Sequence, residues 1–316
     1  MRNTQERSLN EAITIPVGVA YFILALPTVI ANTLVIIAIF KTPSLRIPGY
    51  IILCGLALSD LGVGIFGFFF NGLLFLSGLK NVISDPGQAN SFITGFFVGV
   101  STLTILAVSA ERVIALTLHL RYPSLVTIRR VSLVLVIIWF FMAIMVALPI
   151  DDTEVSYMMI SYFGADFVIL FILNFKIYRM VRRHRAQISI HYPTQANEET
   201  MAMLRRRRSS LDVLYIFFLF VLSILPYIVF QGYLQFFVLF KNPSLDVEDV
   251  EVLMNADLVV RGIAFINSFL NPILYCYRIK HIRVAIIRVL PALLSRKLSS
   301  NCGVKLNINN MKGVAD

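Results

Sequence analysis

Apolar residues in this chain gather into seven long runs that are separated by short polar loops. The runs cover residues 15–40, 49–76, 89–118, 131–147, 157–176, 211–240 and 252–277. An α-helix needs about 20 apolar residues to cross a bilayer, and each run approaches or exceeds that length. The pattern therefore predicts an all-α fold, a bundle of seven transmembrane helices at residues 15–277, preceded by an N-terminal tail at residues 1–14.

The segment after the last run predicts a shorter helix of a different kind. Its apolar residues fall largely on one helical face, with Arg283 at the margin, and they are Ile279, Ile282, Ile286, Val289 and Leu290. A helix with this pattern lies along a membrane surface and does not cross it. We expect residues 278–316 to form an amphipathic eighth helix and a cytoplasmic tail.

Composition agrees with an integral membrane protein. Of the 316 residues, 58% are hydrophobic and 15% are charged, whereas soluble domains are about half apolar and about a quarter charged. The net charge of +10 does not predict nucleic-acid binding. Its basic residues stand in short loops beside the apolar runs, where such residues act as topology signals.

Loop charges predict the orientation of the bundle. Basic residues mark one set of loops and the C-terminal segment, and they include Lys41, Arg46, Arg121, Arg129, Arg130, Arg182, Arg183, Arg205 to Arg208, Arg278, Lys280 and Arg283. Acidic residues mark the opposite loops: Asp85, Asp151, Asp152, Glu154, Asp246, Glu248, Asp249 and Glu251. Because positive loops stay in the cytoplasm, the N-terminus is expected outside the cell and the C-terminus inside.

The three cysteines predict no structural disulfide. Cys54, Cys276 and Cys302 all fall on the cytoplasmic side or in the inner half of the membrane under this topology, where thiols stay reduced. Cys302 follows the amphipathic segment and is a candidate for palmitoylation.

Polar residues within the apolar runs are candidates for function, because they are costly to bury without partners. Asp60 lies about halfway along the second run. Residues at similar depth in other runs are Asn32, Ser101, Asn267 and Asn271. Together with Asp60 they could line a hydrated cavity that holds a sodium ion, or they could form a purely structural hydrogen-bond network between helices.

Several motifs, taken in their order along the chain, resemble the rhodopsin-like family of G-protein-coupled receptors. They are the segment 56–60 ending in Asp60, the pair Glu111 and Arg112, Trp139 in the fourth run, and the ending Asn271, Pro272 and Tyr275. The resemblance extends from Asn32 to the short helix after Tyr277. It implies a multi-pass plasma-membrane receptor whose partners are membrane lipids, an extracellular ligand and a heterotrimeric G protein.

The resemblance also implies roles for residues that would support activation. Arg112 would leave Glu111 on activation and contact the G protein, while Tyr178 and Tyr275 would turn inward. Pro226 matches the proline that gives the sixth helix a place to bend, and Phe220 would carry part of the packing change.

The chain departs from the family pattern at several places. Val113 replaces the tyrosine that usually follows the arginine, and Ile224 replaces the tryptophan two residues before the sixth-helix proline. The family's disulfide and the proline of its fifth helix are also missing. The last two departures resemble the melanocortin and cannabinoid branch.

Basic residues before the sixth run suggest raised basal signalling. Many relatives place an acid there that pairs with the third-helix arginine, whereas this chain has Arg205 to Arg208, so Arg112 would face like charge. The same basic residues could instead be only a topology and lipid-headgroup patch. Ser209 and Ser210 beside them form a candidate phosphorylation site.

Candidate ligand-binding residues lie in the outer halves of the runs: Thr94, Asp166, Tyr227, Gln231, Asp257 and Arg261. Thr94 stands where monoamine receptors carry an aspartate, so an ordinary amine site is not expected, although Asp166 is deep enough to anchor a cationic group. Alternatively, Arg261 is neutralised by Asp166 or by Asp257, without a role in binding. A small molecule, a lipid or a peptide all remain candidate ligands.

Two other function classes compete with a receptor. An ion channel or carrier would use Asp60 and the asparagines as an ion path, but it would not explain Glu111 and Arg112 beside a basic rim. An intramembrane enzyme would need a hydrolase or metalloprotease motif, and the sequence contains none. We therefore predict a non-enzymatic receptor with no cofactor other than a sodium ion at Asp60.

Overall fold

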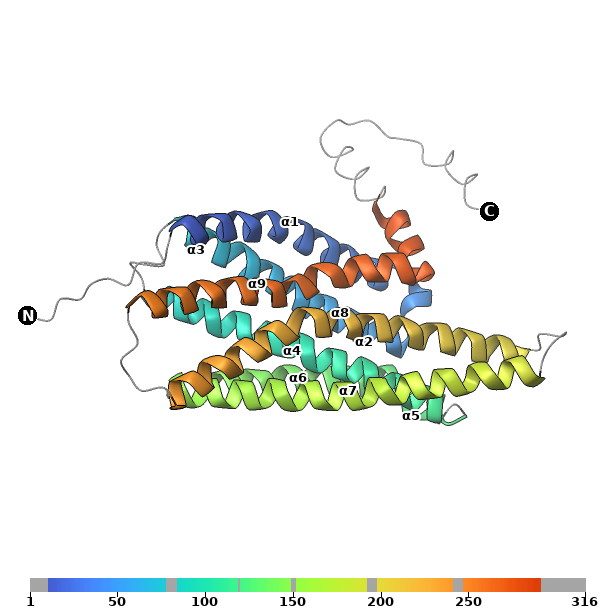
Figure 1. The fold of residues 1–316 in the computed structure, drawn as a ribbon. Helices are drawn as coiled ribbons and strands as arrows, with labels where there is room; N and C mark the ends of the chain where they lie inside the picture. The colour runs from blue at the N-terminus through green and yellow to red at the C-terminus, as the bar shows by residue number, and fades with distance from the viewer. Residues whose placement is uncertain are drawn as a thin grey trace, which may run out of the picture.

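A computed structural model describes residues 11–77, 84–118, 120–148, 152–191, 198–240 and 247–290. Within these ranges the chain forms helices and short connections and contains no strand. The long helices lie side by side as one bundle (Figure 1). The prediction of an all-α fold is confirmed.

Eleven labelled elements make up the described part of the bundle. In chain order they are α1 (Glu11–Lys41), η1 (Pro43–Leu45), α2 (Pro48–Gly62), η2 (Val63–Phe70), α3 (Asn71–Leu76), α4 (Ser84–Thr117), α5 (Tyr122–Leu125), α6 (Ile128–Ala147), α7 (Asp152–His191), α8 (Glu198–Phe240) and α9 (Val247–Arg278). Seven segments of the described chain are long and apolar enough to cross a membrane, as predicted.

Most helices extend beyond the apolar runs that predicted them. α1 begins at Glu11, before the expected start at residue 15, and α4 begins at Ser84, before residue 89. Hydropathy marks the part of a helix that suits lipid, but backbone hydrogen bonding continues into polar residues beyond the hydrocarbon core. The helix ends therefore could not be found from apolarity alone.

The second membrane span contains the largest departure from regular α-helix. Between α2 and α3, the π-helical segment η2 spans Val63–Phe70. The Asn71 side-chain amide donates hydrogen bonds to the carbonyl oxygens of Phe66, at 3.1 Å, and Gly67, at 2.9 Å. A π segment changes the register of the main-chain bonds, and Asn71 supplies extra donors where the regular α-helix resumes.

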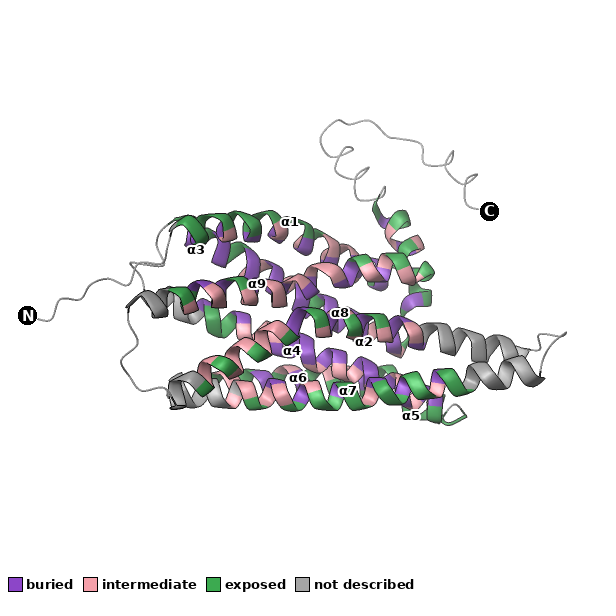
Figure 2. Cartoon of the chain, in the orientation of Figure 1, coloured by how far each residue is buried: buried purple, intermediate pink, exposed green. Residues whose placement is uncertain are grey.

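The outer surface of the bundle is apolar, and its interior holds the buried residues (Figure 2). On α6, for example, Leu133, Val136 and Phe140 are exposed while Ile138 and Met142 are buried. Large apolar surfaces of this kind are unusual in contact with water. They suit a helix that meets lipid on one side and protein on the other.

A short helix at residues 280–290 follows α9 and turns away from its axis (Figure 1). Its buried residues are Ile282, Ala285 and Val289, whereas His281 and Arg283 are exposed. Ile282 joins the same core cluster as Tyr275 at the end of α9. The predicted amphipathic eighth helix is confirmed, with its apolar face docked on the bundle. Leu290, however, which we expected on that face, is exposed because the helix turns it away from the buried positions 282, 285 and 289.

Candidate functional site

Three polar regions follow one another along the bundle. Arg112 lies near the last turn of α4, and Arg261 lies in the first half of α9. We name the two ends of the bundle after them, the Arg112 end and the Arg261 end. Asp60 in α2 occupies the interior between them.

At the Arg112 end, Glu111 and Arg112 form an ion pair within α4. The Arg112 Nε atom lies 2.6 Å from Glu111 Oε2, without the alignment of a hydrogen bond. The other Glu111 oxygen accepts a short hydrogen bond from the Tyr122 hydroxyl of α5. Burial, together with the Glu111 carboxylate, raises the pKa of the Tyr122 phenol, so this hydroxyl remains a donor. The predicted resting pair is present, and Tyr122 is a partner that the sequence interpretation missed.

A glycine of α2 allows Arg112 to lie close to the second span. A Cβ atom placed on Gly49 would lie 2.5 Å from Arg112 Nη2. Any larger residue at position 49 would therefore displace the guanidinium, although the long arginine side chain has room to adjust. The absence of a side chain at Gly49 therefore leaves the space that the Arg112 guanidinium occupies.

A second ion pair at the Arg112 end joins two different helices. Arg278 Nε at the end of α9 lies 3.0 Å from Asp212 Oδ1 in α8. The Arg278 guanidinium also lies over the Tyr215 ring, 4.3 Å from its centroid. The sequence interpretation missed this pair because its two members lie 66 residues apart in the chain. Asp212 also follows the basic run Arg205 to Arg208, which dominates the charge of that segment.

The residues predicted to support activation occupy different environments. Tyr275 is fully buried, and its hydroxyl has no hydrogen-bond partner among the described residues. Phe220 is also buried, in the same core cluster as Tyr275. Tyr178 instead points outward, 46% exposed, with the Arg182 guanidinium 5.9 Å from its ring centroid. In this conformation Tyr275 is already inside the bundle, and Tyr178 is not.

Pro226 lies inside α8, and Ile224 stands two residues before it. The proline has no backbone N–H to donate, which weakens the helix at this position. Ile224 is buried between the core cluster of the Arg112 end and a cavity at the other end. The replacement of tryptophan by isoleucine therefore falls at a contact between the two regions.

Asp60 is the centre of the interior polar network. Its carboxylate accepts hydrogen bonds from Ser101 at 2.9 Å, Ser268 at 2.8 Å and Asn271 at 2.8 Å. Asn32 donates to the carbonyl of Ser268 at 3.1 Å. Of the network residues, Ser268 was missed, because a serine beside Asn267 carries no signal in hydropathy or spacing.

The network has the oxygen chemistry that a small hard cation requires. Asp60 supplies a fully buried carboxylate. The side-chain oxygens of Asn32, Asn267 and Asn271 are buried and have no hydrogen-bond partner among the described residues. Unpartnered buried oxygens are costly, and the Asn271 oxygen belongs to a side chain that contacts Asp60, so a cation there would satisfy an atom that the protein leaves unsatisfied. The residues present therefore fit a sodium ion.

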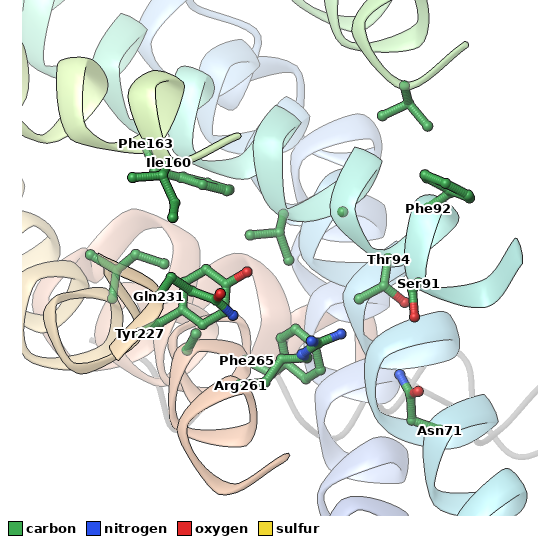
Figure 3. Close-up of a pocket in the computed structure, with 15 residues that line it drawn as sticks. Asn71, Ser91, Phe92, Thr94, Ile160, Phe163, Tyr227, Gln231, Arg261 and Phe265 are labelled. Atoms are coloured by element: carbon green, nitrogen blue, oxygen red, sulfur yellow. The ribbon is translucent and has the colours of Figure 1, made fainter. Parts of the chain in front are cut away.

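At the Arg261 end, residues from several helices line a cavity of about 280 Å³ (Figure 3). Four of the predicted ligand-binding residues contribute to its wall: Thr94, Tyr227, Gln231 and Arg261. The structure adds lining residues that the sequence interpretation missed, among them Asn71, Ser91, Phe92, Ile160, Phe163 and Phe265. Their helices meet here only after the bundle has formed.

Asp257 and Arg261 form an ion pair one turn apart on α9. Asp257 does not line the cavity, but it accepts a hydrogen bond of 2.8 Å from the Gln231 amide of α8. The structure thus shows the pairing of Arg261 with Asp257. Of the two pairings that the sequence left open, the pairing with Asp166 is absent from the described contacts.

Asp166 lies apart from this pair. It is buried in α7, and neither of its carboxylate oxygens has a hydrogen-bond partner among the described residues. It is absent from the residues that line the cavity, although Phe163, one turn earlier on α7, is among them. Asp166 was predicted as a ligand anchor, but its carboxylate is not part of the cavity wall.

Some predicted sites lie outside the described residues or are inaccessible. The side chains of Arg205 to Arg208 and Ser209 are outside the described part of α8, as is Cys302 beyond residue 290. Ser210 is described and is only 1% exposed. A kinase would reach Ser210 only after this part of α8 has separated from its neighbours. Cys54 is a buried free thiol, and Cys276 is half-buried.

Comparison with a family model agrees with these features. The description of that model is "7 transmembrane receptor (rhodopsin family)", and it matches residues 31–155 and 150–275. The matched residues include the Glu111–Arg112 pair, the Asp60 network and the Asn271–Tyr275 segment. The similarity to the melanocortin and cannabinoid branch stays a prediction.

Proposed function

The chain belongs to the rhodopsin family of seven-transmembrane receptors, and from this we propose that it converts extracellular ligand binding into activation of a heterotrimeric G protein. The ligand would occupy the cavity at the Arg261 end, and the G protein would bind at the Arg112 end. The observation that carries the proposal is the arrangement along one bundle of a cavity, a buried polar network and the Glu111–Arg112 pair.

The orientation in the membrane is part of the proposal. The loops at the Arg112 end are basic, whereas acidic residues precede α7 and α9 at the other end. Positive loops stay in the cytoplasm, so the Arg112 end faces the G protein and the Arg261 end faces the extracellular medium. An epitope after residue 290 should therefore be reached by antibody only in permeabilised cells.

The coupling between the ends would pass through packed side chains. Ile224 contacts both the cavity and the core that contains Phe220 and Tyr275. A ligand that moves Ile224 would repack this core and let α8 swing about Pro226. Arg112 would then leave Glu111 and bind the G protein, because its guanidinium is half-buried beside the exposed end of the bundle.

We expect the unliganded receptor to show basal signalling, because the segment where many relatives carry an acid that pairs with the third-helix arginine instead carries Arg205 to Arg208, and like charges do not pair. Asp212 contributes an acid at the same end, but it pairs with Arg278. The measurement is GDP release from a purified G protein mixed with the receptor in lipid nanodiscs. The receptor should accelerate release over empty nanodiscs, and Arg112→Ala should abolish the acceleration.

The matched control for Arg112→Ala is Arg129→Ala, which removes an exposed arginine from the same end of the bundle and should retain the acceleration. Equal release with Arg112→Ala and the unmodified receptor would contradict the proposed role of Arg112. If GDP release with the unmodified receptor is as slow as with empty nanodiscs, the expected basal activity is contradicted. A channel or carrier, which the family match does not favour, would instead give ion flux in sealed vesicles.

We also propose that Asp60 binds a sodium ion in the inactive receptor. A ligand that binds only the folded state of a protein stabilises that state, and the stabilisation grows with the ligand concentration. The melting temperature of the purified receptor should therefore be higher in sodium chloride than in choline chloride of equal ionic strength, by about a few degrees. Asp60→Asn should remove the difference. Equal melting of the unmodified receptor in both salts would contradict this site.

A further inference from the structure

The cavity at the Arg261 end is chemically divided. One side presents the Arg261 guanidinium and the hydroxyl groups of Thr94 and Ser91, and Figure 3 shows the guanidinium pointing toward that side. The other side presents the apolar residues Ile160 and Phe163 of α7, with Tyr227 and Gln231 of α8 beside them (Figure 3). A ligand that matches both sides must be an amphiphile, with one polar end and one apolar end.

The polar side offers hydrogen-bond donors that the protein does not use. The Arg261 Nε atom is buried and has no hydrogen-bond partner among the described residues, and the same holds for Thr94 Oγ1. An unsatisfied buried N–H costs free energy, and this cost is recovered when a ligand supplies an acceptor. The ligand therefore gains most if its polar end carries acceptor atoms.

Arg261 is held in a charged and oriented state by its neighbours. Asp257 contacts Nη2 of the guanidinium, and Gln231 donates to the other Asp257 oxygen at 2.8 Å. Both Asp257 oxygens are thus engaged, and Asp257 does not line the cavity. A guanidinium has five N–H donors, so Arg261 can hold Asp257 and still bind a second carboxylate through its free Nε edge.

Among the described lining residues, Arg261 is the one that carries a formal charge. Asp166 is buried and is not among the residues that line the cavity, so its carboxylate is not presented to a ligand there. An ammonium group would lose its hydration and meet a positive guanidinium. A carboxylate meets an opposite charge and unused donors.

We propose that the receptor's ligand is an amphiphile with an anionic, carboxylate-class head bound by Arg261 and Thr94, and with an apolar body against Ile160 and Phe163. The inference rests on the proposed function in taking this cavity as the ligand site. It selects between the two charged anchors that the sequence offers, Arg261 for an anion and Asp166 for a cation.

The test compares three probes that share one apolar body: 4-phenylbutyrate, 4-phenylbutyramide and 4-phenylbutylamine. Their affinities for the purified receptor in lipid nanodiscs are measured by saturation-transfer NMR titration at pH 7.4. We expect phenylbutyrate to bind at least tenfold more tightly than phenylbutylamine, with the neutral amide between them. A site that leaves donors unsatisfied discriminates strongly against a ligand without acceptors.

Variants assign the preference to Arg261. Arg261→Gln should weaken phenylbutyrate binding at least tenfold and leave amide binding within about threefold. Because this change leaves Asp257 without its partner, the double variant Asp257→Asn/Arg261→Gln removes both charges and should give the same result. Asp166→Asn is the matched control and should leave phenylbutyrate binding unchanged. Gel filtration and melting temperature confirm that each variant is folded.

Tighter binding of phenylbutylamine, lost in Asp166→Asn, would overturn the proposal in favour of a cationic ligand. Equal binding of the three probes, or no saturable binding of any, would overturn it as well. The measurement uses no G protein. A receptor that binds phenylbutyrate through Arg261 but does not activate a G protein would contradict the proposed function alone.

Discussion

The two ends of the bundle use ion pairs in different ways. At the Arg261 end, Asp257 and Arg261 pair one turn apart on a single helix. At the Arg112 end, Asp212 of α8 pairs with Arg278 of α9. The ion pair within α9 does not itself join two helices, although Asp257 also accepts a hydrogen bond from Gln231 of α8, which an asparagine at position 257 can still accept. A pair between helices must break before those helices can separate.

This difference matches the tasks that we propose for the two ends. The Asp257–Arg261 pair orients a cation beside the cavity, where the proposed ligand would meet it. The Asp212–Arg278 pair, with Tyr215 under the guanidinium, holds the end of α8 against α9. Basal signalling should therefore depend on the pair that joins two helices, and much less on the pairs that lie within one helix.

The largest change in basal G-protein activation is expected from Asp212→Asn. The change removes an ion pair whose side chains are 12% and 26% exposed, and it leaves Arg278 without its carboxylate. A loss of about 1–2 kcal/mol, between the values for surface and buried pairs, corresponds to roughly 5–30-fold. Basal G-protein activation per receptor at the cell surface should rise by that factor.

Asp257→Asn is the comparison variant, because it breaks the ion pair within α9. Its basal activation should stay within about twofold of the unmodified receptor. The charge reversal Asp212→Arg/Arg278→Asp should return basal activation toward the original level. An equal rise in basal activation with Asp212→Asn and Asp257→Asn would contradict the proposed difference between the two ends. It would show that loss of a negative charge raises activation at either end.

A smaller effect is expected from Tyr215→Leu. The Arg278 guanidinium lies 4.3 Å from the Tyr215 ring centroid, and a cation–π contact contributes about 0.5–1 kcal/mol when it is partly exposed. Loss of the ring should raise basal activation roughly two- to fivefold. Tyr215→Phe retains an aromatic ring and should show no rise. If both variants behave alike, the ring does not support Arg278.

Among the changes at the Arg112 end that alter a side-chain contact, Gly49→Ala should have the smallest effect on basal activation. The added methyl group would lie 2.5 Å from the present position of Arg112 Nη2, so the guanidinium would have to shift. Because the Glu111–Arg112 pair lies within one helix and the side chain is flexible, basal activation should change by less than about threefold. The same nucleotide-release measurement detects it. A change as large as that of Asp212→Asn would show that the position of Arg112 itself controls the inactive state.

The sequence predicted which residues were costly to bury, but not which of them would meet. Asp60 and Asn271 were both expected in one network, and the structure joins them at 2.8 Å. Ser268, which bonds the same carboxylate, was not expected, because a single serine in an apolar run has no distinctive spacing. Asp212 was overlooked for a similar reason, since it follows a longer and more conspicuous basic run.

Amino-acid order alone determined the number of membrane helices, the amphipathic helix that follows them and the residues of the family motifs. These features depend on local apolarity and periodicity, which are visible along one chain. Only the tertiary structure decided that Arg261 pairs with Asp257, that Arg278 reaches Asp212 on another helix, and that Asp166 is not among the residues that line the cavity. Partners of this kind depend on how each helix is rotated and shifted against its neighbours, and packing between helices, which hydropathy does not record, sets those positions.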